Sequence, residues 1–409
     1  MRTAIIVLAL ICCCTLALAQ PYCIETFDNL EAIKGRKGLT VAPPETSVVA
    51  ADTAAVGEGA LTVTLAPRAK VTVPLETEVF SDVEAIDQCN GIRLWLKGDG
   101  SDGYGCVAFG SDGAFIYELW FPLKDTQWHQ VTCRLDELVP MNQVMPIGSP
   151  GGAPPSALGA ITLGTRWYLL WNNEPMPEYA FSIDNVELIA DAPEAAPAPP
   201  PAPLSEALGR MKNKQPVVWY CMGDSITAGT GLPDKYNQQY AVVLQRLLRE
   251  RLGYDGIRVE SRAVGGARIW DARVWAPRDL AGDPPDIVSI CYGYNDKSGA
   301  QTKEFFKYSL TDYTVRIRRL TGGHAAIVPI TTLPGAHARF VMMDDYAEGV
   351  REVCAEQGLE CLDLSGLIKP MGRVAWEQYM GDRAHPNAQG HEWLATQMAD
   401  WVMAKIGEL

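Results

Sequence analysis

The chain has 409 residues, of which 47% are hydrophobic, and its formal net charge is -14 at pH 7. This length exceeds what one ordinary hydrophobic core accommodates, so two domains are expected. The excess of acidic residues repels nucleic acids and anionic polymers, so no nucleic-acid partner is expected and neutral ligands are favoured.

The N-terminal residues have the pattern of an export signal. Arg2 precedes an apolar stretch from about Ala4 to Leu16, and Ala17–Ala19 supplies an A-x-A cleavage pattern before Gln20. This pattern predicts a signal peptide over residues 1–19 and a secreted protein, either extracellular or periplasmic. The stretch is too short to span a bilayer and no other segment approaches that length, so a membrane-spanning protein is not expected.

Eight cysteines remain after cleavage, four in each half of the chain. They are Cys23, Cys89, Cys106, Cys133, Cys221, Cys291, Cys354 and Cys361. An exported compartment allows disulfides within each half, and Cys354 with Cys361 is the best local candidate pair. Cys221 and Cys291 lie in apolar runs, where buried free thiols are the alternative. No cysteine or histidine spacing predicts a metal site.

Residues 20–190 contain short runs rich in aliphatic and aromatic residues, separated by glycine and aspartate turns. The runs are Ala60–Leu65, Gly91–Lys97, Ala114–Phe121, Trp128–Leu135, Trp167–Trp171 and Tyr179–Ile189. Many short strands at this spacing predict an all-β domain, a two-sheet β-sandwich or jelly roll. In the last run the alternation of apolar residues slips at Asn185.

This region resembles the β-sandwich carbohydrate-binding modules that accompany secreted carbohydrate-active enzymes, most clearly in Tyr117–Leu135 and Phe181–Ile189. The resemblance implies glycan binding, and it implies that Glu25, Asp28 or Asp184 holds a structural calcium, with solvated turn carboxylates as the alternative. Five tryptophans would stack on sugar rings if exposed, although packing in the core is the commoner role. They are Trp95, Trp120, Trp128, Trp167 and Trp171.

Residues 191–208 are a proline- and alanine-rich linker, with six prolines between Asp191 and Pro203. Such a composition favours polyproline II and a semi-rigid spacer. It predicts that the linker separates two bodies that orient independently.

From residue 209 the sequence alternates between strand and helix patterns. The strands are expected at Val217–Met222, Ile257–Glu260, Asp286–Tyr292, Ala325–Ile330 and Leu359–Leu364. Helical periodicities occupy Tyr240–Leu252, Lys303–Leu320, Val341–Gln357 and Asn387–Ile406. This order predicts a three-layer α/β/α domain over residues 209–409, with a five-stranded parallel sheet.

Four polar segments lie at the ends of these elements. Gly223–Thr227 reads GDSIT, Ser261–Gly266 reads SRAVGG, Gly293–Asp296 reads GYND and Asp382–Asn387 reads DRAHPN. Each alone is compatible with an ordinary turn, cap or surface loop. Because the carboxyl ends of parallel strands meet at one edge of a sheet, we expect the four segments to lie together there.

Together these segments supply the groups that acyl transfer needs. A serine hydroxyl requires a base within hydrogen-bond reach, so we expect Ser225 as nucleophile and His385 as base, with Asp382 holding the imidazole. The expected oxyanion donors are the backbone N–H groups of Ser225 and Gly266 and the side-chain amide of Asn295. This chemistry requires no metal or other cofactor.

Other residues near these segments are weaker candidates. Tyr294, Trp270 and His337 are expected in loops beside the site and are candidates for substrate binding, with packing as the alternative. His391 is expected to face outward from the last helix.

The four segments make the C-terminal domain similar to the SGNH (GDSL-type) hydrolases, a family of serine esterases. GDSIT corresponds to the nucleophile block, Gly266 to the glycine block, GYND to the GxND block and DRAHPN to the DxxH block. Ser261 stands where the family usually has asparagine. The resemblance implies an esterase with a Ser–His–Asp triad.

Taken together, the sequence predicts a secreted esterase that removes acetyl or other short acyl groups from carbohydrate esters. Two alternatives stay open. One is a lipase or thioesterase that uses the same residues, and the other is a glycan-binding surface protein with a vestigial hydrolase domain.

Overall fold

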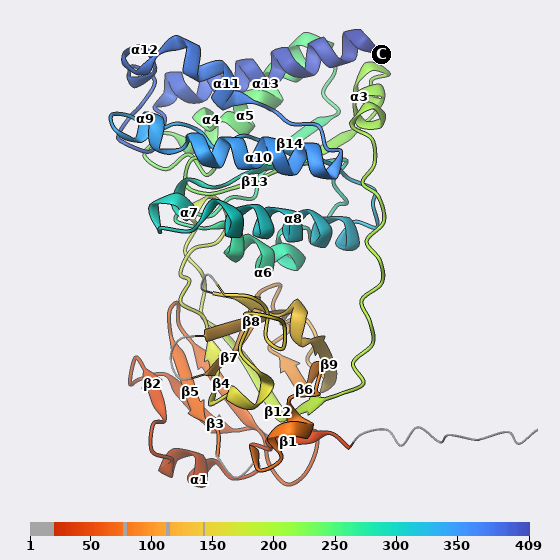
Figure 1. Ribbon diagram of the computed structural model, residues 1–409, viewed down its shortest axis with the longest axis vertical. Coiled ribbons are helices and arrows are strands. Elements are labelled where there is room, and N and C mark those ends of the chain that lie inside the picture. Colours follow the sequence, from red (N-terminus) through yellow and green to blue (C-terminus); the bar gives the residue numbers. More distant parts are fainter. Residues whose placement is uncertain (1–19, 77–79, 112–114, 142–143) are drawn as a thin grey trace, which may run out of the picture.

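The structure is a computed structural model of the chain that describes residues 20–76, 80–111, 115–141 and 144–409. The predicted signal peptide and Ala114, the first residue of one predicted strand, lie outside the described residues. Figure 1 shows two stacked parts, with antiparallel strands at one end and alternating strands and helices at the other.

Two six-stranded antiparallel sheets form the N-terminal part. The first has the order β3-β4-β12-β6-β9 with β1 beside β12, and the second has the order β10-β8-β7-β11-β5-β2. The first comprises β1 (Tyr22–Glu25), β3 (Ser47–Ala50), β4 (Leu61–Leu65), β6 (Gly91–Gly98), β9 (His129–Arg134) and β12 (Tyr179–Ile189). The second comprises β2 (Thr40–Ala42), β5 (Lys70–Pro74), β7 (Tyr104–Ser111), β8 (Phe115–Pro122), β10 (Val139–Pro140) and β11 (Ala160–Gly164). Short helices α1 (Leu30–Gly35) and α2 (Val83–Ile86) lie between strands.

Buried residues of both sheets belong to one hydrophobic cluster, so the predicted two-sheet, all-β region is confirmed. The jelly-roll topology stays a prediction. The predicted slip at Asn185 is a real irregularity, because the register of β12 against β6 shifts between Asp184 and Glu187. Trp167–Trp171, by contrast, is not a strand, and the chain there leads into the one-turn 3-10 helix η4 (Trp171–Asn173).

The three carboxylates expected at a calcium site have other partners. Glu25 forms an ion pair with Arg36. Asp28 Oδ1 accepts two backbone N–H groups at 2.7 and 3.0 Å, and Asp184 Oδ2 accepts two at 2.8 and 2.9 Å. Within the described ranges no group of three or more acidic, histidine or cysteine side chains is arranged to hold a metal ion, so the calcium expectation is not supported.

All eight cysteines in the described part of the chain are free thiols, so no expected disulfide is formed there. Cys354 and Cys361 are neighbours, and a hydrogen bond between them raises the pKa of Cys354. Cys221 and Cys291 are 0% and 4% exposed, which confirms that they fill the core.

A four-stranded parallel sheet with the order β14-β13-β15-β16 forms the centre of the C-terminal part. Its strands are β13 (Val217–Gly223), β14 (Ile257–Ser261), β15 (Ile287–Cys291) and β16 (Ala326–Pro329). The longer helices are α3 (Leu204–Lys212), α5 (Tyr240–Leu252), α6 (Ile269–Asp279), α8 (Lys303–Leu320), α10 (Asp344–Gln357) and α13 (Ala388–Glu408). The shorter helices are α4 (Lys235–Gln238), α7 (Tyr294–Ser298), α9 (Arg339–Met342), α11 (Leu364–Ile368) and α12 (Arg373–Glu377).

Helices cover both faces of this sheet. Along β13, Trp219 and Cys221 belong to a cluster with α3, α5 and α13, whereas Tyr220 and Met222 belong to a cluster with α6, α8 and α10. Successive side chains of a strand point to opposite faces, which explains why the run is apolar throughout. The predicted α/β/α layering is therefore observed.

The predicted fifth strand is wrong. Leu362 forms only an isolated parallel bridge to Ile330, and α11 begins at Leu364. Asp363 accepts the N–H of Gly366 and caps this helix. The cap ends the extended segment too early for a ladder to form.

Helix α6 connects the two parts of the molecule. Ten of its residues are buried, because β13 covers one side and β8 and β10 lie on the other. The Trp275 ring, 0% exposed, packs edge-on against Trp120 and Trp167 at 5.7 and 4.5 Å between ring centroids. Trp120 and Trp167 therefore pack in an internal interface and are not exposed for stacking on sugar rings.

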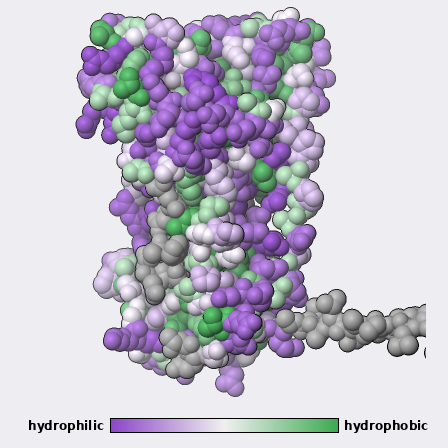
Figure 2. Space-filling model, in the orientation of Figure 1, coloured by the Kyte–Doolittle hydropathy of each residue, from purple (hydrophilic) through white to green (hydrophobic). Residues whose placement is uncertain are grey.

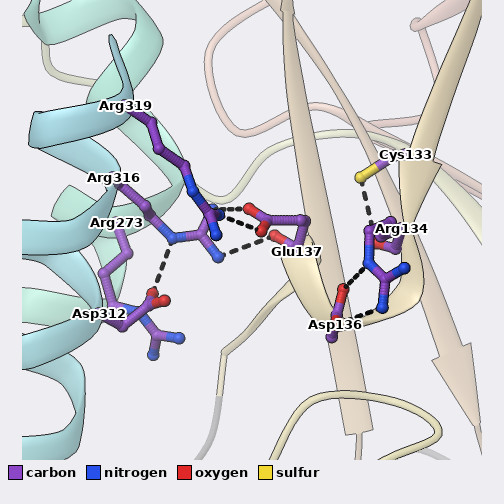
Figure 3. A network of polar contacts seen from close by, with 8 residues as sticks. All are labelled: Cys133, Arg134, Asp136, Glu137, Arg273, Asp312, Arg316 and Arg319. Atoms are coloured by element: carbon purple, nitrogen blue, oxygen red, sulfur yellow. Dashed lines mark hydrogen bonds and ion pairs between the residues drawn. The ribbon is translucent and has the colours of Figure 1, made fainter. Parts of the chain in front are cut away.

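Ion pairs extend this interface. Figure 3 shows Glu137 of the N-terminal part pointing toward Arg316 and Arg319 of α8. Arg319 Nη1 lies 2.6 Å from Glu137 Oε1, and Arg316 Nη2 donates to the Glu137 carbonyl at 3.1 Å. On the other side of the interface, Arg166 Nη2 donates to the buried Asp271 of α6 at 2.8 Å.

The linker follows the outside of the molecule from β12 to α3 (Figure 1). The expectation that it separates independently oriented bodies is wrong, because the two parts share a continuous hydrophobic cluster. Figure 2 shows a largely hydrophilic surface over α8 and α10. Within the described residues, no helix is both long and apolar enough to cross a membrane.

Replacing Trp275 with alanine tests this interface. The change removes the ring that packs against Trp120 and Trp167, so we expect the free energy of unfolding to fall by about 3–5 kcal/mol. Denaturant titration measures it, with Val374→Ala at a 69% exposed position as the control. A loss no larger than that of the control would show that the two parts do not stabilise each other through this ring.

Candidate active site

Ser225 follows the carboxyl end of β13 at the edge of the parallel sheet. A Cβ atom at Gly223 would lie 2.0 Å from Thr227 Oγ1, so the turn needs glycine at this position. Asp224 Oδ1 accepts the N–H of Ile226 at 2.9 Å and fixes the start of the turn. The turn leaves Ser225 half-buried.

The structure brings Ser225, His385 and Asp382 together. His385 Nε2 lies 2.9 Å from Ser225 Oγ, and His385 Nδ1 lies 2.8 Å from Asp382 Oδ2. Asp382 Oδ1 also accepts the backbone N–H groups of Ala384 and His385, at 2.6 and 2.7 Å. The aspartate therefore organises the turn that presents the histidine.

These bonds determine which nitrogen of His385 carries the proton. Partial burial opposes ionisation of Asp382, but the hydrogen bonds from His385 and Ala384 outweigh it and lower the pKa of Asp382 to about 2. An ionised carboxylate only accepts hydrogen bonds, so Nδ1 must donate to it. Nε2 is then free to accept the Ser225 hydroxyl proton.

Two backbone N–H groups near the serine are available to a ligand. Those of Ser225 and Gly266 donate to no acceptor within the described part of the chain. Val264 N–H donates to the Gly223 carbonyl at 3.1 Å, which holds the segment that leads to Gly266 beside the end of β13. Gly266 has a φ of +80°, a conformation that favours glycine.

Asn295, the third expected donor, lies near these two N–H groups, but its side-chain amide already donates hydrogen bonds within the protein. Its Nδ2 donates to the Ala267 carbonyl at 3.0 Å and approaches Asp224 Oδ2 at 3.4 Å. The bond to Ala267 fixes the orientation of the amide. The longer contact to Asp224 is the weaker one and would be the first to yield to a ligand oxygen.

Two buried carboxyl groups accept backbone N–H groups of the turns around the site. Burial raises the pKa of Asp224 to about 7, although the Ile226 N–H and the charge of His385 lower it in part. Burial also raises the pKa of Asp296 to about 7, and its oxygens accept the N–H groups of Ile269 and Gly293.

The remaining candidates do not line the pocket beside the triad. Trp270 is 3% exposed inside α6 and packs against Phe305, so the expected loop position is wrong. Tyr294 is 5% exposed and donates to the Arg383 carbonyl at 2.8 Å. His337 is exposed, and its Nδ1 lies 3.2 Å from Glu377.

His391 is buried rather than facing outward. Its Nδ1 accepts the backbone N–H of Tyr240 at 3.1 Å, and its ring stacks on the Tyr240 ring. Burial lowers the pKa of His391 to about 3. The residue is a neutral structural histidine behind the triad.

A pocket of 410 Å³ opens beside the triad, with Thr230, Leu232, Asp382, His385 and Gln389 among its lining residues. A second, shallower groove of 620 Å³ shares Ala388 and Gln389 with it. The two therefore adjoin each other at the start of α13.

Sequence reasoning missed the contribution of the N-terminal part to this site. The η4 turn contacts the segments around Gly265 and Thr230 through Asn173. An asparagine pair at positions 172 and 173 was the only signal, and such pairs are common in ordinary turns.

The buried carboxyl of Asp224 makes a prediction about stability and pH. Its pKa is raised in the folded state, so the unfolded chain binds fewer protons, and stability should fall as pH rises from about 4 to about 7. Asp224→Asn should remove this pH dependence. As the pH rises through that range, the free energy of unfolding of the wild type should fall relative to that of the variant by up to about 1.4 kcal/mol per pH unit. Urea unfolding measured at several pH values tests this. Asp102→Asn at an exposed turn is the control, and parallel curves for wild type and Asp224→Asn would contradict the assignment.

Comparison with known proteins gives a family match for the C-terminal part. Residues 221–393 match the family described as the GDSL-like Lipase/Acylhydrolase family. No curated protein matches the chain.

Solved structures that resemble this chain include one lipase and two esterases. A putative GDSL-like lipase from Parabacteroides merdae is 21% identical, with a TM-score of 0.40, over 47% of this chain and 97% of that one. The acetyl xylan esterase AlAXEase is 20% identical, with a TM-score of 0.39, over 46% and 100%. The psychrotrophic esterase EstA from Pseudoalteromonas sp. is 15% identical, with a TM-score of 0.38, over 46% and 98%. The family match shows that the C-terminal domain, over residues 221–393, belongs to the GDSL-like lipase/acylhydrolase family.

Proposed function

We propose that the protein is a serine ester hydrolase that removes acetyl or other short acyl groups from carbohydrate esters. The observation that carries this proposal is the continuous hydrogen-bond chain from Ser225 Oγ through His385 to Asp382, with contacts of 2.9 and 2.8 Å. The family of the C-terminal domain supports ester hydrolysis as the reaction class.

The reaction follows from the arrangement of these groups. His385 Nε2 takes the proton of the Ser225 hydroxyl as its oxygen attacks the ester carbonyl. Asp382 stabilises the imidazolium that forms. The free N–H groups of Ser225 and Gly266 bind the oxyanion, with the amide of Asn295 beside them. His385 then returns the proton to the leaving alkoxide, and water releases the acyl group by the same steps.

The lining of the groove beside the catalytic pocket supports a substrate whose alcohol moiety is neutral and rich in hydroxyl groups. Carboxamide and aromatic side chains line it, namely Asn237, Gln238, Gln378, Tyr379, Gln389 and Trp393. Carboxamides both donate and accept hydrogen bonds and so match sugar hydroxyls, and aromatic rings supply apolar faces for sugar rings. Its one acidic residue, Glu392, is paired with Arg246 at 2.9 Å.

Export also fits a polymeric substrate outside the cell. We base this part of the proposal on the signal-peptide pattern of residues 1–19 and on the acidic net charge of -14, which suits a neutral polymer.

Two substitutions test the reaction. Ser225→Ala should abolish hydrolysis of p-nitrophenyl acetate and acetate release from acetylated xylan, because it removes the nucleophile. Asp382→Asn should lower kcat by about a hundred- to ten-thousandfold, because the amide no longer holds the imidazole in the reactive tautomer.

The acyl specificity is tested by a series of p-nitrophenyl esters from acetyl to palmitoyl. The proposal requires a preference for the short esters, and a preference for palmitoyl would favour the lipase alternative. Equal turnover by wild type and Ser225→Ala would rule out the serine mechanism, whereas glycan binding without turnover of any ester would favour the vestigial-enzyme alternative.

The groove makes a separate prediction. Replacing Gln378 with alanine should raise KM for an acetylated polysaccharide by about fivefold, the effect of losing one hydrogen bond. KM for p-nitrophenyl acetate should not change, because Gln378 lines the groove but not the pocket beside the triad. Equal effects on the two substrates would show that the groove does not bind the polymer.

A further inference from the structure

The turn η4 (Trp171–Asn173) carries the N-terminal part of the chain to the candidate active site. An isolated bridge between Leu169 and Pro175 closes its base. Trp171 Nε1 donates to Asp279 of α6 at 2.8 Å and anchors one end of the turn. The turn is therefore held against the C-terminal part on the side where Gly265 and Thr230 lie.

Asn173 connects two segments of the site with one carboxamide. Its Oδ1 accepts the backbone N–H of Gly265 at 2.6 Å, and its Nδ2 donates to Thr230 Oγ1 at 2.7 Å. Thr230 N–H in turn donates to the Ser225 carbonyl at 2.9 Å. The residues next to these contacts are the two with free backbone N–H groups, Ser225 and Gly266.

The backbone on both sides is suited to this contact. Asn172 and Asn173 have φ values of 54° and 60°, which asparagine tolerates better than most residues. A Cβ at Gly265 would lie 2.5 Å from Asn173 Oδ1, so only glycine permits the approach. Asn172 N–H also donates to the Ala263 carbonyl at 2.8 Å.

A third set of contacts fixes the outer side of the turn. Lys235 Nζ donates to the Asn172 carbonyl at 2.5 Å and lies 3.1 Å from Glu174 Oε1, which also accepts the Tyr236 hydroxyl. These contacts hold the turn but do not reach Gly265. Glu174 therefore offers a matched control for Asn173.

We propose that Asn173 is a positioning residue for the oxyanion site, supplied by the N-terminal part to the C-terminal one. This inference rests on the proposed ester hydrolysis. Gly265 and Gly266 lack side chains and have wide backbone freedom, so an unrestrained peptide would not keep the Gly266 N–H directed at one point. The Asn173 carboxamide supplies that restraint by accepting the Gly265 N–H. It also binds Thr230, whose N–H donates to the Ser225 carbonyl, so the same side chain restrains the turn that carries the nucleophile.

Such positioning acts on the transition state more than on substrate binding. Charge develops on the carbonyl oxygen only as Ser225 attacks, so donors held in place beforehand stabilise the transition state selectively. Loss of the restraint should therefore lower kcat and leave KM nearly unchanged.

The test compares Asn173→Gly with Glu174→Gln in the full chain. Glycine accepts the positive φ of Asn173 and removes its side chain, including the carboxamide. With p-nitrophenyl acetate as substrate, we expect Asn173→Gly to lower kcat by about 10- to 100-fold, with KM within about twofold of wild type. Glu174→Gln should keep wild-type kcat.

Binding of phenylboronic acid provides a readout that a purely structural role would not move. The boronate forms a tetrahedral adduct with the serine, so its affinity should fall in Asn173→Gly by a factor similar to the fall in kcat. Active-site titration with a phosphonate corrects both measurements for the folded fraction. Unchanged kcat and boronate affinity in Asn173→Gly would overturn the inference, as would a lower melting temperature with full activity per titrated site. Absence of Ser225-dependent turnover in the wild type would instead contradict the proposed function itself.

Discussion

Helix α6 is enclosed on two sides, and this packing determines how the two parts of the chain are arranged. Strand β13 lies against one side of the helix, and β8 and β10 lie against the other. The buried Trp275 and the Arg166–Asp271 ion pair hold the N-terminal strands in this position. Because the sheets cannot turn away from α6, the η4 turn is held beside the segment that ends at Gly266. The N-terminal part is thus a component of the site region as well as a neighbouring domain.

The carboxyl groups at the site fall into two electrostatic classes. Asp382 is partly exposed and receives several hydrogen bonds, which keep it ionised and able to accept a hydrogen bond from His385 Nδ1. Asp224 and Asp296 are fully enclosed, and burial shifts their pKa values upward to about 7. The ionised Asp382 faces the imidazole, whereas Asp224 and Asp296, whose pKa values are shifted toward neutrality, lie beneath the turns. Because Asp224 lies beside the Asn295 amide, its raised pKa reduces the negative charge next to the place where an oxyanion would form.

Much of the C-terminal part could be predicted from the sequence because its signals are local. The apolar run of β13 and the polar segment after it identify a buried strand and the position of Ser225. The order of strands and helices places Ser225 and His385 at one edge, although 160 positions separate them. The chemistry of acyl transfer then restricts the roles that a serine, a histidine and an aspartate can take.

The parts that the sequence did not reveal depend on contacts between distant residues. Helix α6 buries charged residues together with apolar ones, so it lacks the separation of a polar and an apolar face from which a helix is usually predicted. The proline-rich linker has the composition of a spacer, yet the interface beside it is formed by Trp120, Trp167 and Trp275, which no local pattern connects. The partners of Asn173 are equally remote in sequence.

The central claim is that His385 activates the Ser225 hydroxyl, and covalent labelling tests it most directly. Treatment with diisopropyl fluorophosphate followed by peptide mass spectrometry should give one adduct, located on Ser225. The rate of its formation should fall strongly in His385→Ala. A protein that forms no adduct at Ser225, or forms it at the same rate without the imidazole, would contradict the account.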